Sequence, residues 1–138
     1  MKKQFKVSID YLYPMLEFIC SQATNAGFDK EYLYRIELAS EEAIVNVLKY
    51  SGLDPSNIID ITCTPTGAPG IQITIRDRGV PYNPLSVPEK NLEVPLEIED
   101  APLGGYGVHL MKKLMDHVHY ERDQDANVLT LTKYISCK

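Results

Sequence analysis

Polar and apolar residues alternate in five segments of the chain, which is the period expected of half-buried β-strands. The alternation covers residues 2–9, 57–64, 70–76, 118–123 and 127–135. Turn-forming residues separate the second segment from the third, Pro65-Thr66-Gly67-Ala68-Pro69, and the fourth from the fifth, Asp125-Ala126. The pattern therefore predicts one strand near the start of the chain and two antiparallel hairpins after it.

Apolar residues recur with the helical period in three further segments. Helices are predicted over about residues 10–26, 30–50 and 107–117. Asp10 and Asp29 are the expected N-caps of the first two helices, and Gly27 is the expected stop of the first. Because the strands come in antiparallel pairs instead of alternating with helices, an α+β two-layer sandwich is favoured over a doubly wound nucleotide-binding fold.

The composition fits one ordinary globular domain. The chain has 138 residues, of which 44% are hydrophobic, so a core can form without disulfides or metal. Its three cysteines lie far apart and predict reduced thiols. The net charge of -5 argues against a duplex nucleic-acid binder, and no apolar run approaches the ~20 residues of a membrane helix. With no apolar signal stretch after the basic start, we expect a single cytoplasmic domain over residues 1–138 that contacts neither nucleic acid nor a membrane.

An acidic segment containing four prolines precedes the last predicted helix. Against the single Lys90 it carries five carboxylates: Glu89, Glu93, Glu97, Glu99 and Asp100. Its prolines, which disfavour regular structure, are Pro84, Pro88, Pro95 and Pro102. The segment between residues 77 and 107 is therefore predicted to be a long loop, interrupted at most by a short helix.

A first motif of polar residues lies on the predicted helix over residues 30–50. Glu42 and Asn46 are four residues apart, which places them one turn apart on the same helix face. A carboxylate there can orient a nucleophile, and an amide oxygen can help to hold a hard cation. Taken alone, the pair equally fits a solvated helix surface.

A second motif follows the strand predicted over residues 70–76. It reads Asp77-Arg78-Gly79-Val80-Pro81-Tyr82-Asn83-Pro84. An aspartate at a strand end can accept a hydrogen bond from a base amine, and Gly79 would let a ligand approach the backbone. A tight turn with no ligand is the alternative interpretation.

A third motif, Gly104-Gly105-Tyr106-Gly107, opens the last predicted helix. Small residues at a helix start expose unpaired backbone N–H groups to an anion. No Gly-Lys-Ser/Thr follows, so this is not a Walker A loop, and the preceding acidic loop excludes the Rossmann fingerprint. The alternative is a glycine hinge for the loop.

In this order and spacing the three motifs resemble the GHKL, or Bergerat-fold, ATPases. The resemblance is closest to the small bacterial anti-sigma factor serine kinases. ELASEEAIVNVLKYS resembles their N box, IRDRGVPYNP their first glycine box, GGYGVHLMKKLMDHVHYER their second, and NVLTLTKY their final strand. The resemblance covers roughly residues 5–135. It implies a mixed, mostly antiparallel sheet of four or five strands covered on one face by three helices.

The resemblance also implies ATP and Mg²⁺ as cofactors and a role for each motif. Glu42 would be the general base, Asn46 would ligate Mg²⁺, and Asp77 would bind the adenine amine. Lys49 stands where many relatives carry histidine and would reach phosphate, and Asn127 or Thr130 would take the adenine contact of the final strand. The remaining implied nucleotide contacts are Gly79, Pro81, Gly104, Gly105, Tyr106 and Gly107. Residues 85–103 would form the lid over ATP.

The function implied is that of a protein serine/threonine kinase. Its substrate would be a serine of a STAS-type anti-sigma-factor antagonist, and in the family such kinases also sequester a sigma factor, usually as homodimers. The alternative is a nucleotide-switched protein-binding module of the same fold, which would not need Glu42 as a base. A histidine kinase is disfavoured because the chain has no room for a dimerisation and phosphoacceptor domain.

Overall fold

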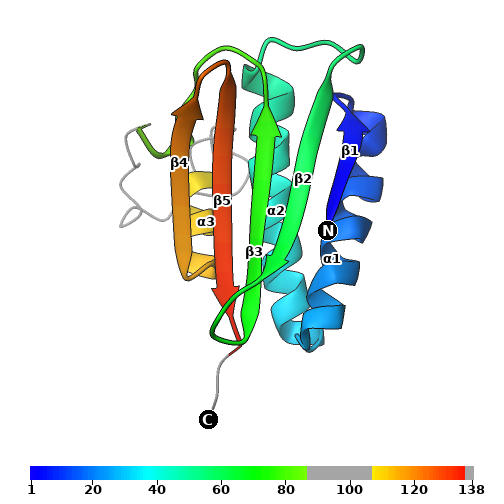
Figure 1. The fold of residues 1–138 in the computed structure, drawn as a ribbon, viewed down its shortest axis with the longest axis vertical. Coiled ribbons are helices and arrows are strands. Elements are labelled where there is room, and N and C mark those ends of the chain that lie inside the picture. Colours follow the sequence, from blue (N-terminus) through cyan, green and yellow to red (C-terminus); the bar gives the residue numbers. More distant parts are fainter. Residues whose placement is uncertain (87–106, 136–138) are drawn as a thin grey trace, which may run out of the picture.

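Five strands and three helices form two layers, with all three helices on one face of the sheet (Figure 1). The computed structural model describes residues 1–86 and 107–135. The elements are β1 (Lys2–Lys6), α1 (Leu12–Ala26), α2 (Lys30–Tyr50), β2 (Ile58–Pro65), β3 (Gly70–Asp77), α3 (Gly107–Leu114), β4 (His117–Asp123) and β5 (Ala126–Tyr134). Short 3₁₀ turns occupy Ile9–Tyr11 and Pro84–Ser86. No helix within these two described stretches combines the length and hydropathy that a membrane crossing requires.

The strand order is β1-β2-β3-β5-β4, and each neighbouring pair of described strands is antiparallel. The predicted α+β two-layer fold is therefore confirmed, with an antiparallel sheet in place of the mixed one. The last residue of β3, Asp77, lies directly opposite Asn127 near the start of β5. This register brings two polar side chains together at one end of the sheet.

Alternate residues of the strands face the helices and build the core. The inward-facing residues include Ile59 and Ile61 of β2, Ile71, Ile73 and Ile75 of β3, and Leu129 and Leu131 of β5. They pack against Met15 and Ile19 of α1 and Ile36 and Ile44 of α2. The residues between them, such as Thr74 and Thr130, occupy the sheet face that carries no helix.

The ends of α1 and α2 agree with the predicted caps, except at Asp10. Asp29 caps α2 as predicted, because its Oδ1 accepts a hydrogen bond from the Tyr32 N–H at 3.1 Å. Gly27 ends α1 in a left-handed conformation, φ 106°, which glycine adopts without strain. Asp10 is not a cap. Instead, Ser8 Oγ accepts from the Asp10 N–H at 3.2 Å and opens a 3₁₀ turn that leads into α1.

Two predicted boundaries are also wrong by a few residues. The last helix ends at Leu114 because β4 already begins at His117. The turn between β4 and β5 consists of Gln124, whose φ of 56° is left-handed, and Asp125. It is one residue earlier than the predicted Asp125-Ala126, because Ala126 pairs with Asp123 in the ladder. Both shifts come from strand pairing, which the local pattern does not encode.

Candidate functional site

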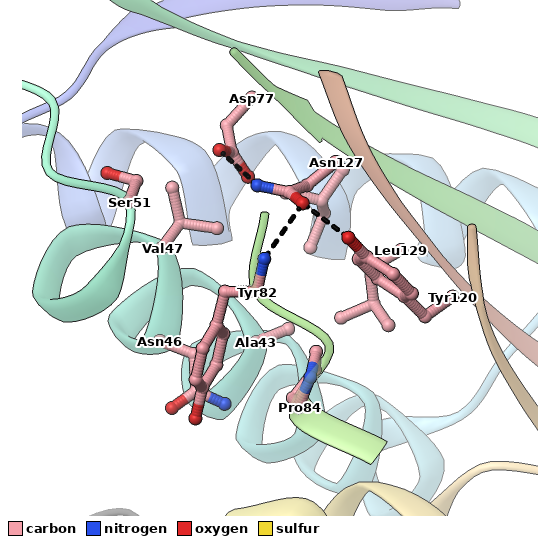
Figure 2. A pocket seen from close by; sticks show the side chains of 11 residues that line it. Ala43, Asn46, Val47, Ser51, Asp77, Tyr82, Pro84, Tyr120, Asn127 and Leu129 are labelled. Atoms are coloured by element: carbon pink, nitrogen blue, oxygen red, sulfur yellow. Dashed lines mark hydrogen bonds between the residues drawn. The ribbon is translucent and has the colours of Figure 1, made fainter. Parts of the chain in front are cut away.

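A small, partly open pocket lies between α2, the ends of β3, β4 and β5, and the loop after β3 (Figure 2). Its polar lining comprises Asn46, Ser51, Asp77, Tyr82, Tyr120 and Asn127. Apolar side chains complete it: Ala43, Val47, Ile75, Pro84 and Leu129. The pocket thus brings together the first two sequence motifs, one contributed by α2 and the other by β3 and its loop. A concave site that combines an apolar lining with a few polar groups is typical of small-molecule sites.

Asp77 presents a buried carboxylate to this pocket, with 4% of the residue exposed. Its Oδ1 accepts hydrogen bonds from the Gly79 N–H at 2.9 Å and from Asn127 Nδ2 at 3.1 Å. Both bonds from described residues end on Oδ1, so Oδ2 remains as an acceptor for a ligand. An acceptor-only group in a pocket that also has apolar walls suits an amino group, such as that of adenine.

Asn46 lies one helical turn before Tyr50 on α2 and is 5% exposed. Its Nδ2 has no hydrogen-bond partner among the described residues. An unpaired buried amide costs about 1–3 kcal/mol, so such a group at a pocket indicates a missing partner. Its side chain can give an oxygen to Mg²⁺ and an N–H to a phosphate oxygen, and it therefore fits the metal and the nucleotide that the resemblance implies.

Glu42 lies one turn before Asn46 on α2 and is half-buried. Burial raises the pKa of its carboxyl above the ordinary glutamate value, the neighbouring Glu41 raises it further, and Lys49 lowers it. Lys49 itself is exposed and lies two turns further along the same helix face. Neither Glu42 nor Lys49 lines the described pocket, so their predicted contacts with substrate and phosphate stay predictions. A carboxylate of raised pKa is a stronger proton acceptor than an ordinary one.

The loop after β3 is fixed to both sides of the pocket. The Val80 N–H donates to the Ser51 carbonyl at 2.9 Å, and Arg122 Nη1 donates to the Gly79 carbonyl at 2.8 Å. The Tyr82 ring stacks on Tyr50 at the end of α2, with centroids 4.7 Å apart and planes at 22°. Burial, together with Tyr50, raises the pKa of Tyr82. The loop is therefore held in place by contacts with both the end of α2 and β4, and it forms one wall of the pocket.

Gly79 is required by packing within the protein. A Cβ at this position would lie 2.4 Å from the Ser51 carbonyl oxygen and 2.6 Å from the Ser51 Cβ. Gly79 and the exposed Pro81 flank the pocket without lining it. Close approach of two backbone segments thus explains the glycine of the second motif, and a ligand contact at Gly79 stays a prediction.

Replacing Gly79 with alanine is therefore expected to destabilise the fold by about 1–3 kcal/mol, because backbone must move to admit the methyl group. The midpoint of thermal unfolding should fall by about 5–10 °C. Gly67→Ala is the matched control, since a Cβ there meets no atom within 4 Å and the change should be close to neutral. Equal midpoints for the two variants would contradict this reason for the glycine.

The final strand places Asn127, and not Thr130, at the pocket. Asn127 and Leu129 point toward the helices and line it, whereas Thr130, between Leu129 and Leu131, points to the helix-free face. The predicted nucleotide contact by Thr130 is therefore wrong. Sequence reasoning also assigned no role to Ser51, Tyr82 or Tyr120. The position of Tyr120 depends on the β4–β5 register, for which the sequence offers no local signal.

The third motif is described only at its end. Gly107 begins α3, as predicted, and α3 packs against α2 on the helical layer. Gly104, Gly105 and Tyr106 lie outside the described residues, as does the predicted lid from residue 87 onward. Their contacts with phosphate stay a prediction.

Comparisons with known proteins agree with this geometry. Residues 5–133 match the family described as the histidine kinase-like ATPase domain. The chain is 30% identical over 105 residues to the serine/threonine-protein kinase BtrW of Bordetella bronchiseptica, covering 73% of this chain and 70% of that protein. It is 29% identical over 121 residues to the serine-protein kinase RsbW of Listeria monocytogenes, covering 84% and 74%.

Solved structures share the fold. The structure of the RsbU and RsbW domains of a Mycobacterium tuberculosis protein superposes with a TM-score of 0.67 at 12% identity, covering 97% of this chain and 32% of that one. The histidine kinase domain of a blue-light activated kinase from Erythrobacter litoralis gives a TM-score of 0.51 at 14% identity, covering 88% and 60%. The resemblance to anti-sigma factor serine kinases is thus confirmed, and the chain belongs to the histidine kinase-like ATPase domain family.

Proposed function

We propose that this chain is an ATP- and Mg²⁺-dependent protein serine kinase. One observation carries the proposal: a buried carboxylate with one free oxygen, Asp77, and a buried unpaired amide, Asn46, face the same pocket. Glu42, a base of raised pKa, stands one turn away. The names of the curated relatives, both protein kinases that act on serine, support the same activity.

Each residue then has a distinct task. Asp77 Oδ2 accepts a hydrogen bond from the adenine amino group, and Asn46 contributes an oxygen to Mg²⁺. When bound, Mg²⁺ neutralises charge on the phosphate oxygens. Hard cations such as Mg²⁺ usually take one or two protein oxygens together with phosphate oxygens and water, which agrees with a single amide ligand at this position.

Glu42 acts as the general base for the acceptor serine. Its carboxylate takes the hydroxyl proton as the serine oxygen bonds to the γ-phosphorus and the bond from that phosphorus to the bridging oxygen of ADP breaks. Phosphoserine and ADP are the products. In this proposal Lys49, exposed at the end of the same helix face, contacts phosphate. Its charge lowers the pKa of Glu42 from the value that burial and Glu41 together would give.

The proposed phosphoacceptor is a STAS-type anti-sigma-factor antagonist, and the proposed second partner is a sigma factor bound by a homodimer of this chain. These partners rest on the resemblance to anti-sigma factor kinases. Transfer of labelled γ-phosphate from ATP to a serine of a co-encoded STAS protein tests the assignment. Nucleotide binding without any transfer would instead indicate a nucleotide-switched binding module.

Binding of ATP should depend on magnesium and on Asn46. We expect calorimetric titration to give at least about tenfold tighter ATP binding with Mg²⁺ than without it, and Asn46→Ala to remove most of that difference, because the amide supplies a metal ligand. Asn25→Ala, an exposed change on α1, is the matched control and should bind like the parent. Absence of binding at millimolar ATP would refute the proposed function.

A further inference from the structure

Asn127 is the centre of a hydrogen-bond network beside Asp77 in the pocket (Figure 2). Its Oδ1 accepts from the Tyr82 N–H at 3.2 Å and from the Tyr120 hydroxyl at 2.5 Å. Its Nδ2 donates to Asp77 Oδ1 at 3.1 Å and to the Val80 carbonyl at 2.8 Å. The residue is 5% exposed, so these four partners replace water.

These partners use the full capacity of the amide. An asparagine side chain offers two lone pairs and two N–H groups, and each has a partner here. Two donors face its oxygen and two acceptors face its nitrogen, which fixes the orientation of the amide. Asn127 therefore lines the pocket without a free group for a ligand, and it reaches a ligand only through Asp77.

The network also determines which oxygen of Asp77 is free. A carboxylate rotates easily about its last bond, because this torsion has only broad, roughly two-fold preferences. The N–H groups of Asn127 and Gly79 both bind Oδ1, which leaves Oδ2 as the acceptor for a ligand. The same amide binds the backbone of Val80 and Tyr82, so the carboxylate and the loop wall are held in one arrangement.

We propose that Asn127 is a positioning residue that gives the pocket its preference for a 6-amino purine, with the Tyr120 hydroxyl holding Asn127 in place. The inference rests on the proposed nucleotide binding and adds the origin of base selectivity. Asn127 keeps Asp77 Oδ2 presented as an acceptor. ATP has an amino donor at purine position 6, which can bind Oδ2. ITP has an oxygen acceptor there, which would face the carboxylate oxygen, so the pocket rejects ITP.

The test is the ratio of the ITP and ATP dissociation constants, measured by calorimetry with Mg²⁺ on the full chain. We expect the parent to prefer ATP at least about 30-fold. In Asn127→Leu the ratio should fall to less than about 5. Tyr120→Phe removes one of the two hydrogen bonds to Asn127 Oδ1, and it should reduce the ratio by a factor of about two to five. Thr74→Val, on the helix-free face of β3, is the control and should keep the parent ratio.

The ratio of the ITP and ATP dissociation constants distinguishes a positioning role of Asn127 from a purely structural one. A purely structural role would weaken ATP and ITP by the same factor, so an unchanged ratio in Asn127→Leu and Tyr120→Phe would overturn the inference. If Asn127→Leu does not give a folded far-UV circular dichroism spectrum, Tyr120→Phe decides alone, since it keeps the ring and removes one hydroxyl. A parent chain that binds neither nucleotide would overturn the proposed function itself and the inference with it.

Discussion

Replacing Glu42 with glutamine is expected to slow phosphate transfer to the acceptor serine by about 10²–10⁴-fold, the usual contribution of a positioned general base. Glutamine keeps the size of the side chain and its place on α2, but it cannot accept the hydroxyl proton. Glu42 does not line the described nucleotide pocket, so the dissociation constant for ATP should change less than about threefold. Single-turnover transfer and calorimetric titration measure the two effects separately.

The control for this prediction is Glu37→Gln, which removes another carboxylate of α2 and should leave transfer intact. The pH profile adds a second criterion. Because Glu42 must be ionised to act, the rate should rise with pH through its pKa, which burial places above the ordinary value. Lys49 lowers this pKa, so Lys49→Met should move the rise to higher pH, and Glu41→Gln should move it to lower pH. Full transfer by Glu42→Gln would exclude the role.

Replacing Asp77 with asparagine is expected to weaken ATP binding by about 100-fold and to reverse base preference toward ITP. The N–H groups of Gly79 and Asn127 require an acceptor at the position of Oδ1, so the new amide must place its oxygen there. Its NH₂ group then occupies the position of Oδ2. With ATP, this NH₂ group faces the adenine amino group, so the charge-assisted hydrogen bond of the parent is lost. With ITP, the same NH₂ group can donate to the 6-oxygen of the base.

The matched control for this change is Asp60→Asn, a carboxylate-to-amide change on the helix-free face of β2, which should leave both affinities unaltered. Competition of ITP against ATP at fixed Mg²⁺ measures the preference directly. Retained preference for ATP in Asp77→Asn would show that the base is recognised elsewhere in the pocket.

The sequence predicts the element order and much of the site because both depend on local patterns. Asp29 and Gly27 mark helix ends through bonds and torsions within a few residues, and the spacing of Glu42 and Asn46 follows from helix geometry. Asp77 is found in the same way, as the last residue of an alternating strand. Such features need no knowledge of the tertiary arrangement.

What the sequence does not predict depends on long-range pairing. The pairing of Asn127 with Asp77 requires the register of β5 against β3, since a shift of one residue would exchange the two faces. Gly79 has a clear reason only once Ser51 lies beside it, 28 positions earlier in the chain. Tyr120 joins the site through β4, whose pairing follows from the same sheet.

The strand order divides the molecule into two halves with different constraints. Described residues that line the pocket come from α2, β3, β4, β5 and the segments next to them, while β1, α1 and β2 contribute none. β1 and α1 lie together at the opposite edge of the sheet (Figure 1). Substitutions along that edge can alter the outer surface without touching the residues that line the pocket. The outer surface at this edge and the lining of the pocket are therefore free to evolve separately on this scaffold.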